Sequence, residues 1–156
     1  MTVEEIAGAE EKQRICAAIL RELPQWFGIE EAIERYVRSS AALPMLAVRN
    51  GDDAEGFLAW KRHAPHAAEL YLMGVRPELH GRGIGTALLE AAEDRLEADG
   101  VEYLQVKTLG PSRPSRGYEQ TRRFYEVRGF RALEELPGYW DEDNPCLVMV
   151  KKLECR

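Results

Sequence analysis

The stretch VRPELHGRGIGTALL, which runs from Val75 to Leu89, places three glycines within five residues and then becomes apolar. A glycine cluster at the start of a helix lets backbone N–H groups come close to an anion, because glycine has no side chain in the way. The helix N-terminus adds positive partial charge at the same place. The stretch therefore predicts either a seat for a phosphate group or a flexible turn.

Two kinds of nucleotide-binding loop do not fit these residues. A P-loop requires Gly-Lys followed by Ser or Thr, whereas Gly83 and Gly85 are followed by isoleucine and threonine. A dinucleotide loop requires a third glycine where this sequence has Thr86, and it belongs to a first strand–helix unit rather than to the middle of a chain. Two interpretations remain: a binding site for the phosphate of another ligand, or a flexible turn.

Length and composition suggest an ordinary globular protein with one domain over residues 1–156. The net charge of −6 argues against a non-specific nucleic-acid binder. We expect no signal peptide and no membrane span, because the acidic N-terminus lacks an apolar region and no apolar run is long enough. Cys16, Cys146 and Cys155 are odd in number and widely spaced, which predicts neither a disulfide framework nor a zinc site. The cytoplasm is the expected compartment.

Hydrophobic spacing and turn residues divide the chain into strands and helices. Strands are predicted at 3–7, 45–49, 55–63, 67–75, 101–109, 130–136 and 146–153, and helices at 10–23, 29–39, 83–99 and 118–128. Residues 137–145 are predicted to form a loop between the last two strands. This order predicts an α/β (α+β) protein with a mixed, mostly antiparallel sheet of about seven strands and about four flanking helices. The fourth and fifth strands are expected to be joined by a right-handed crossover.

The glycine stretch resembles the acyl-CoA-binding loop of the GNAT superfamily of N-acetyltransferases. The family pattern is Gln/Arg-x-x-Gly-x-Gly/Ala after Val-x-Pro, and here it runs from His80 to Gly85, with histidine in the first position. The segment YEQTRRFYEVRGF, residues 118–130, is similar to a later helix of the family, written Asn-x-x-Ala-x-x-Phe/Leu-Tyr-x-x-x-Gly-Phe. It departs from that pattern at Tyr118 and Thr121 and matches it at Phe124, Tyr125, Gly129 and Phe130. The resemblance covers nearly the whole chain and implies the acyl-CoA N-acyltransferase fold.

The resemblance implies that acetyl-CoA is the co-substrate and that no metal takes part. Backbone amides from about Arg82 to Thr86 are expected to contact the pyrophosphate, and the pantetheine arm is expected in a gap between strands 67–75 and 101–107. The implied cofactor contacts are Met73, Val75, His80, Gly81, Arg82, Gly83, Ile84, Gly85, Thr86, Tyr118, Arg122 and Tyr125.

Acetyl transfer from a thioester to an amine needs a neutral amine, a donor for the developing oxyanion and a proton for the leaving thiolate. The resemblance implies the Val75 amide as the oxyanion donor, at a strand bulge marked by Gly74. A crowded strand that requires a small residue is the alternative interpretation of Gly74. Tyr125 is implied as the general acid, with a role as a core aromatic residue as the alternative.

The general base is less clearly marked. Glu69 is the first candidate, because burial could raise the pKa of its carboxyl group, but it could equally be a solvated residue on a half-exposed strand. His63 and His66 are further candidates that could equally lie in an exposed turn. His80 is a poor candidate because it belongs to the phosphate loop.

The resemblance places the acceptor between the first two helices, the central strands and the loop that joins the last two strands. Expected acceptor contacts are Trp26, Phe27, Tyr71 and Trp140, with Tyr139 and the carboxylates of residues 141–143 favouring a cationic amine. The alternative is that Trp26 and Phe27 only pack helix against sheet and that the acidic run is a solvated loop. Arg113 and Arg116 could approach the cofactor phosphates or remain in solvent.

These implications predict an acetyl-CoA-dependent N-acetyltransferase that acts on a primary amine of a small molecule or peptide. We expect no nucleic-acid or membrane partner, and a homodimer is possible. A non-catalytic acyl-CoA sensor of the same fold and a transferase that uses a longer acyl-CoA are the alternatives.

Overall fold

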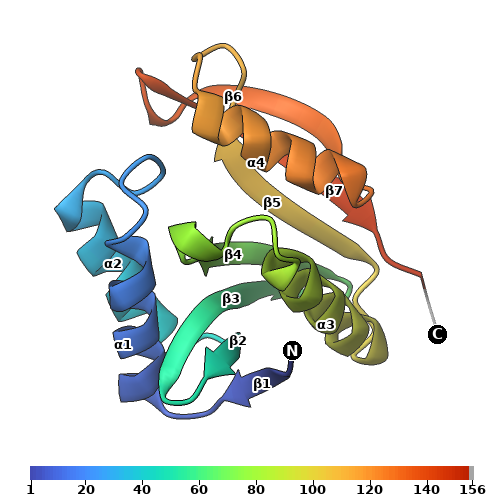
Figure 1. Cartoon of the computed structure of the whole chain (residues 1–156). Coiled ribbons are helices and arrows are strands. Elements are labelled where there is room, and N and C mark those ends of the chain that lie inside the picture. The colour runs from blue at the N-terminus through green and yellow to red at the C-terminus, as the bar shows by residue number, and fades with distance from the viewer. Residues whose placement is uncertain (155–156) are drawn as a thin grey trace.

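The computed structural model describes residues 1–154, which form one sheet with helices on both faces (Figure 1). Along the chain the elements are β1 (Val3–Ile6), α1 (Ala9–Leu20), α2 (Glu30–Ser40), β2 (Met45–Asn50), β3 (Asp53–Ala64), β4 (Ala67–Val75), the 3-10 turn η1 (Pro77–Leu79), α3 (Ile84–Ala98), β5 (Tyr103–Leu109), α4 (Arg116–Val127), β6 (Arg131–Asp141) and β7 (Asn144–Lys152).

The sheet has the order β1-β2-β3-β4-β5-β7-β6. Every neighbouring pair is antiparallel except β4 and β5, which are parallel and are connected through α3. Seven strands and four α-helices within residues 1–154 confirm the predicted mixed, mostly antiparallel architecture. This single parallel pair lies in the middle of the sheet, with β3 on one side and β7 on the other.

Two apolar clusters lie on opposite faces of the sheet, because successive side chains of a strand point to opposite sides. Leu46, Leu58 and Leu70 pack with the helices α3 and α4, which lie in front of the sheet in Figure 1. Met45 and Phe57, each adjacent in sequence to one of those leucines, pack with α1 and α2. The two helix pairs therefore cover different faces, and the sheet separates them.

Two predicted features of the strands are wrong. Residues 137–145 are not a loop: β6 extends to Asp141 and pairs with Asn144, so the last two strands form a hairpin with a two-residue tip. Gly74 does not mark a bulge, because it pairs in register with Phe57. Its small size is required by packing, since a Cβ added there would lie 2.9 Å from Ile19 Cγ2 on α1. The register shift in β4 falls at Tyr71 instead.

Candidate active site

A gap opens between β4 and β5 where their pairing ends. The two strands pair only from Ala67–Leu70 to Tyr103–Val106, and residues 71–75 have no partner in β5. The Arg76 N–H donates to the Glu55 carbonyl of β3 at 3.0 Å. Because alternate residues of a strand bond to the same side, Met73 and Val75 direct their backbone groups toward the gap. The predicted gap is therefore present, and unpaired strand backbone borders it.

The glycine loop ends at the N-terminus of α3, beside this gap. Gly81 and Gly83 have φ values of +80° and +84°, the left-handed conformation that favours glycine. Gly83 is the N-cap of α3, no side chain caps the helix, and its first turn carries no acidic residue. The N–H groups of residues 84–86 therefore lack an intrahelical acceptor, which leaves them able to bind an external anion.

Arg128, which the sequence did not single out, lies against the same helix terminus. Its Nε donates to the Thr86 hydroxyl at 3.0 Å, and its guanidinium stacks 3.7 Å from the centre of the Phe124 ring. Gly85 is close to the same ring, since an added Cβ would lie 3.2 Å from a Phe124 ring carbon. The sequence feature that could have indicated Arg128 is its position immediately before Gly129 in the segment of residues 118–130.

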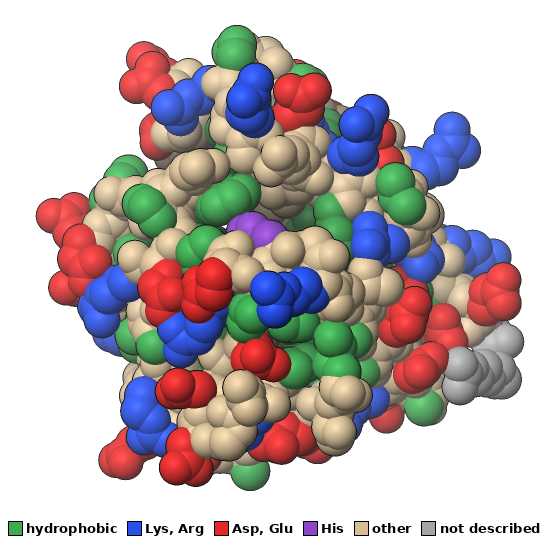
Figure 2. Space-filling view, viewed as in Figure 1, with side chains coloured by type: hydrophobic (Ala, Val, Ile, Leu, Met, Phe, Trp, Pro, Cys, Tyr) green, Lys and Arg blue, Asp and Glu red, His purple; other side chains and the backbone are tan. Residues whose placement is uncertain are grey.

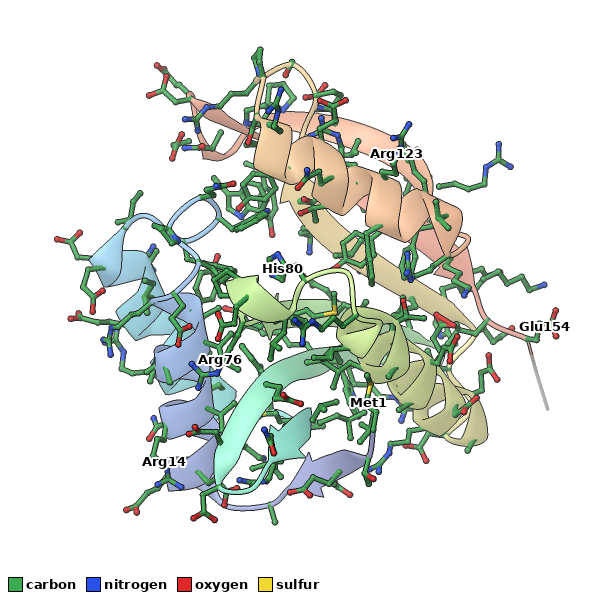
Figure 3. The ribbon with its side chains drawn as sticks, in the orientation of Figure 1. Met1, Arg14, Arg76, His80, Arg123 and Glu154 are labelled. Carbon is green, nitrogen blue, oxygen red and sulfur yellow. The ribbon has the colours of Figure 1, made fainter. Side chains whose placement is uncertain are left out.

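His80 turns back from the loop toward the end of β4. Its Nε2 lies 2.7 Å from the Val75 carbonyl oxygen, so this nitrogen carries the proton and donates. The ring meets Trp26 edge-on, with centroids 5.8 Å apart. Figure 3 labels His80 between α4 and the loop that precedes α3, and Figure 2 shows a purple side chain there at the bottom of a hollow. Its side chain thus lies at the gap and not only in the phosphate loop.

Trp26 connects the segment between α1 and α2 to helix α4. Its Nε1 donates to the Thr121 hydroxyl at 3.0 Å, and its carbonyl accepts a hydrogen bond of 2.9 Å from the Tyr118 hydroxyl. Burial raises the pKa of Tyr118 to about 12. Arg122, one turn further on, donates to the Leu109 carbonyl at 2.7 Å. The two positions at which the second motif departs from the family pattern, Tyr118 and Thr121, are therefore the ones that hold Trp26.

Tyr125 lies on the buried face of α4, with 5% of its surface exposed. Its ring packs edge-on against Phe124 and Phe130, with both pairs of centroids 5.3 Å apart. Burial raises the pKa of its hydroxyl well above the ordinary value. The group is therefore protonated at neutral pH and has a proton to donate.

Glu69 is 6% exposed and belongs to a cluster of charged groups where the gap begins. One of its carboxylate oxygens lies 2.7 Å from His63 Nε2 and 3.0 Å from Lys107 Nζ. Burial alone would lower the pKa of Lys107, but the hydrogen bond and charge of Glu69 outweigh it and raise that pKa. His66, in contrast, packs edge-on against Tyr103 at the closed end of the strands. The structure brings Glu69 and His63 together and leaves His66 apart.

An aromatic wall borders the same face of β4. Tyr71 packs edge-on against Tyr36 of α2, which packs in the same way against Phe27, with centroid distances of 5.7 and 5.8 Å. Tyr139 of the hairpin lies 5.6 Å from Lys107 Nζ and packs against the half-exposed Trp140. Tyr139 thus contacts the lysine that pairs with Glu69, and Tyr71 contacts Lys61, the cross-strand neighbour of Glu69.

The acidic run of the hairpin is used locally. Asp141 accepts hydrogen bonds from the Asn144 side chain at 2.8 Å and from the Asp143 N–H at 2.9 Å, and the Asn144 bond lowers the Asp141 pKa. Arg113 bonds to the Asn144 side-chain oxygen, and Arg116 is exposed at the start of α4. These contacts shape the hairpin turn and give the Asp141 carboxylate a local structural role.

Three further observations concern metal-binding groups, membrane helices and free thiols in the described part of the chain. Within residues 1–154, no group of three or more His, Cys, Asp or Glu side chains is placed to hold a metal ion. None of the helices there has the length and apolar character needed to cross a membrane. Cys16 and Cys146 are buried free thiols, and Cys155 lies outside the described residues.

Comparison with known proteins gives a consistent result over most of the chain. A model described as an acetyltransferase (GNAT) domain matches residues 9–132. A mycothiol acetyltransferase of Sanguibacter keddieii is 40% identical over 72 residues, which are 42% of this chain and 22% of that protein. The chain therefore spans less than a quarter of the length of this relative.

Two solved structures share the architecture at low identity. A chain from Desulfovibrio desulfuricans assigned to the GNAT acetyltransferases has a TM-score of 0.80 at 19% identity, over 98% of this chain and 100% of that one. An aminoglycoside 6'-N-acetyltransferase complexed with coenzyme A has a TM-score of 0.76 at 19% identity, over 100% and 99% of the two chains. These likenesses show a common fold.

Proposed function

The chain belongs to the GNAT acetyltransferase family, and on that premise we propose that it transfers an acetyl group from acetyl-CoA to a primary amine of a small molecule or peptide. The observation that carries the proposal is the uncapped N-terminus of α3, which lies beside the gap between β4 and β5. In this proposal the N–H groups of Ile84, Gly85 and Thr86 bind the pyrophosphate. The backbone of Met73 and Val75 pairs with the pantetheine arm.

The reaction needs one bond to form and one to break. The amine nitrogen attacks the thioester carbonyl carbon, the Val75 N–H stabilises the oxyanion, and the carbon–sulfur bond then breaks. Tyr125 gives its hydroxyl proton to the leaving thiolate, and its raised pKa ensures that the proton is present at neutral pH. Glu69 takes the proton of the amine, and His63, at 2.7 Å from Glu69, leads toward solvent. The aromatic residues Trp26, Phe27, Tyr71 and Trp140 are proposed to surround the acceptor.

The test separates binding from turnover. Coenzyme A binding is measured by calorimetry, and turnover by thiol release from acetyl-CoA with polyamines, aminoglycosides, amino acids and lysine peptides, the acetylated product being identified by mass. We expect Tyr125→Phe to lower kcat on the order of 100-fold, a usual contribution of a general acid, while coenzyme A still binds. Tyr103→Phe is the matched control, because Tyr103 is exposed on β5 outside the gap.

Three results would contradict parts of the proposal. An unchanged kcat in Tyr125→Phe would return Tyr125 to a packing role. Coenzyme A binding with no transfer to any amine would favour the acyl-CoA sensor. Faster turnover with a longer acyl-CoA than with acetyl-CoA would replace the proposed donor.

A further inference from the structure

The charged cluster where the gap begins contains more basic than acidic groups. Lys61 of β3 is the cross-strand partner of Glu69, and His63 and Lys107 both bond to the Glu69 carboxylate. We name these four residues the β4 charge cluster. It holds two ammonium groups and one carboxylate, so with neutral histidine its net charge is positive.

The carboxylate of the cluster has two partners within the protein. Glu69 is buried, its bonded oxygen pairs with the Lys107 ammonium group, and His63 forms a hydrogen bond to the same oxygen. Lys61 is different: within residues 1–154 it forms no ion pair, and its described contact is with the Tyr71 ring, 3.7 Å from Nζ to the centroid. An ammonium group that lies over an aromatic ring keeps most of its charge available to a third group.

A further cation lies near the aromatic wall beside the cluster. The Tyr36 hydroxyl, which packs beside Tyr71, has its pKa raised by burial and by the Tyr71 and Glu69 charges, and lowered by Arg35. Arg35 is therefore a second cation near this wall. The carboxylate of Asp141, near the tip of the hairpin, accepts hydrogen bonds from Asn144.

We infer that the acceptor is an amine that also carries a carboxylate, and that Lys61 pairs with that carboxylate while the amine is held toward the gap. This inference rests on the proposed function and narrows its substrate class. It replaces the purely cationic amine that the acidic hairpin sequence suggested. An α-amino acid and a peptide whose second residue is acidic share this chemistry.

The experiment compares matched amines in the thiol-release assay. The first arm uses L-phenylalanine and its amide. The second uses a C-terminally amidated tetrapeptide with glutamate at its second position and the same peptide with glutamine there. We expect kcat/KM to be at least tenfold higher for the carboxylate member of one pair, and the arm that shows it identifies the source of the carboxylate.

The variant Lys61→Met keeps an unbranched stem over Tyr71 and removes the charge. We expect it to abolish the preference within that pair by lowering kcat/KM only for the carboxylate substrate. Lys152→Met, in an exposed position on β7, should leave the preference intact. Unchanged coenzyme A binding and thermal unfolding would show that Lys61→Met is folded.

The outcomes distinguish the inferred carboxylate-bearing acceptor from the proposed acetyltransferase activity. If amides are acetylated as well as carboxylates, or if Lys61→Met keeps the preference, the inference is wrong and the acetyltransferase proposal stands. If no amine of either kind is acetylated, the proposed function falls and the inference falls with it.

Discussion

The substitution Gly83→Ala tests the proposed phosphate seat with a cost that can be worked out in advance. Gly83 has a φ of +84°, and alanine in the left-handed conformation is strained by about 1–2 kcal/mol. A Cβ added there meets nothing within 4 Å, so no steric clash adds to this strain. For a domain of this size, 1 kcal/mol corresponds to roughly 2–4 °C in Tm, and we expect a Tm about 2–8 °C lower.

The effect on binding should exceed the effect on stability. The new methyl group would project into open space at the N-cap of α3, where the pyrophosphate is proposed to bind. We expect coenzyme A to bind at least tenfold more weakly, about 1.4 kcal/mol. Gly100→Ala is a close control, because Gly100 follows the other end of α3 with a φ of +87° and also has nothing within 4 Å of an added Cβ.

Thermal unfolding and calorimetric titration with coenzyme A would be measured for both variants. The reasoning requires a similar loss of Tm in the two proteins and a loss of affinity in Gly83→Ala alone. Equal loss of affinity in both would mean that general stability governs binding. Wild-type affinity in Gly83→Ala would refute the phosphate seat.

Three further predictions use the same assays. Trp26→Phe removes the hydrogen bond to Thr121 and should lower the free energy of unfolding in urea by about 1 kcal/mol; an unchanged value would mean that this bond does not hold the segment. Burial raises the pKa of Cys16 to about 11, whereas the unfolded thiol ionises near 9.0, so stability should be intact below pH 9 and fall toward pH 11. Between pH 8 and pH 10.5, the free energy of unfolding in urea should fall less for Cys16→Ala than for the wild type. An identical fall in both proteins would contradict the raised pKa of Cys16 as its cause. Glu69→Gln should lower kcat at least tenfold while coenzyme A affinity persists, and an unchanged kcat would leave Glu69 a structural ion-pair partner.

The architecture was predictable because its signals are local. The helical spacing of Leu88 and Leu89 and the glycine at residue 100 predict α3 to within a residue or two of its ends. The last two strands were predicted, but the extension of β6 to Asp141 was missed because Pro137 and Gly138 are typical of loops. Pairing with β7 carries the strand past them as an irregularity.

The site was less predictable, because its geometry depends on contacts between distant segments. The glycine loop could be recognised from its own residues. The bond between Trp26 and Thr121 joins positions 95 residues apart, and the partners of Glu69 come from two different strands. Gly74 shows the same limit: its role is decided by Ile19 of α1, which local sequence does not reveal.

Helix α4 is tied near both ends, to Trp26 through Tyr118 and Thr121 and to the start of α3 through Arg128. The pantetheine arm of coenzyme A, proposed to lie in the gap, would enter between these two sets of contacts and would leave by the same path. If withdrawal of the spent arm limits the cycle, a looser tie would give faster turnover together with weaker retention of product.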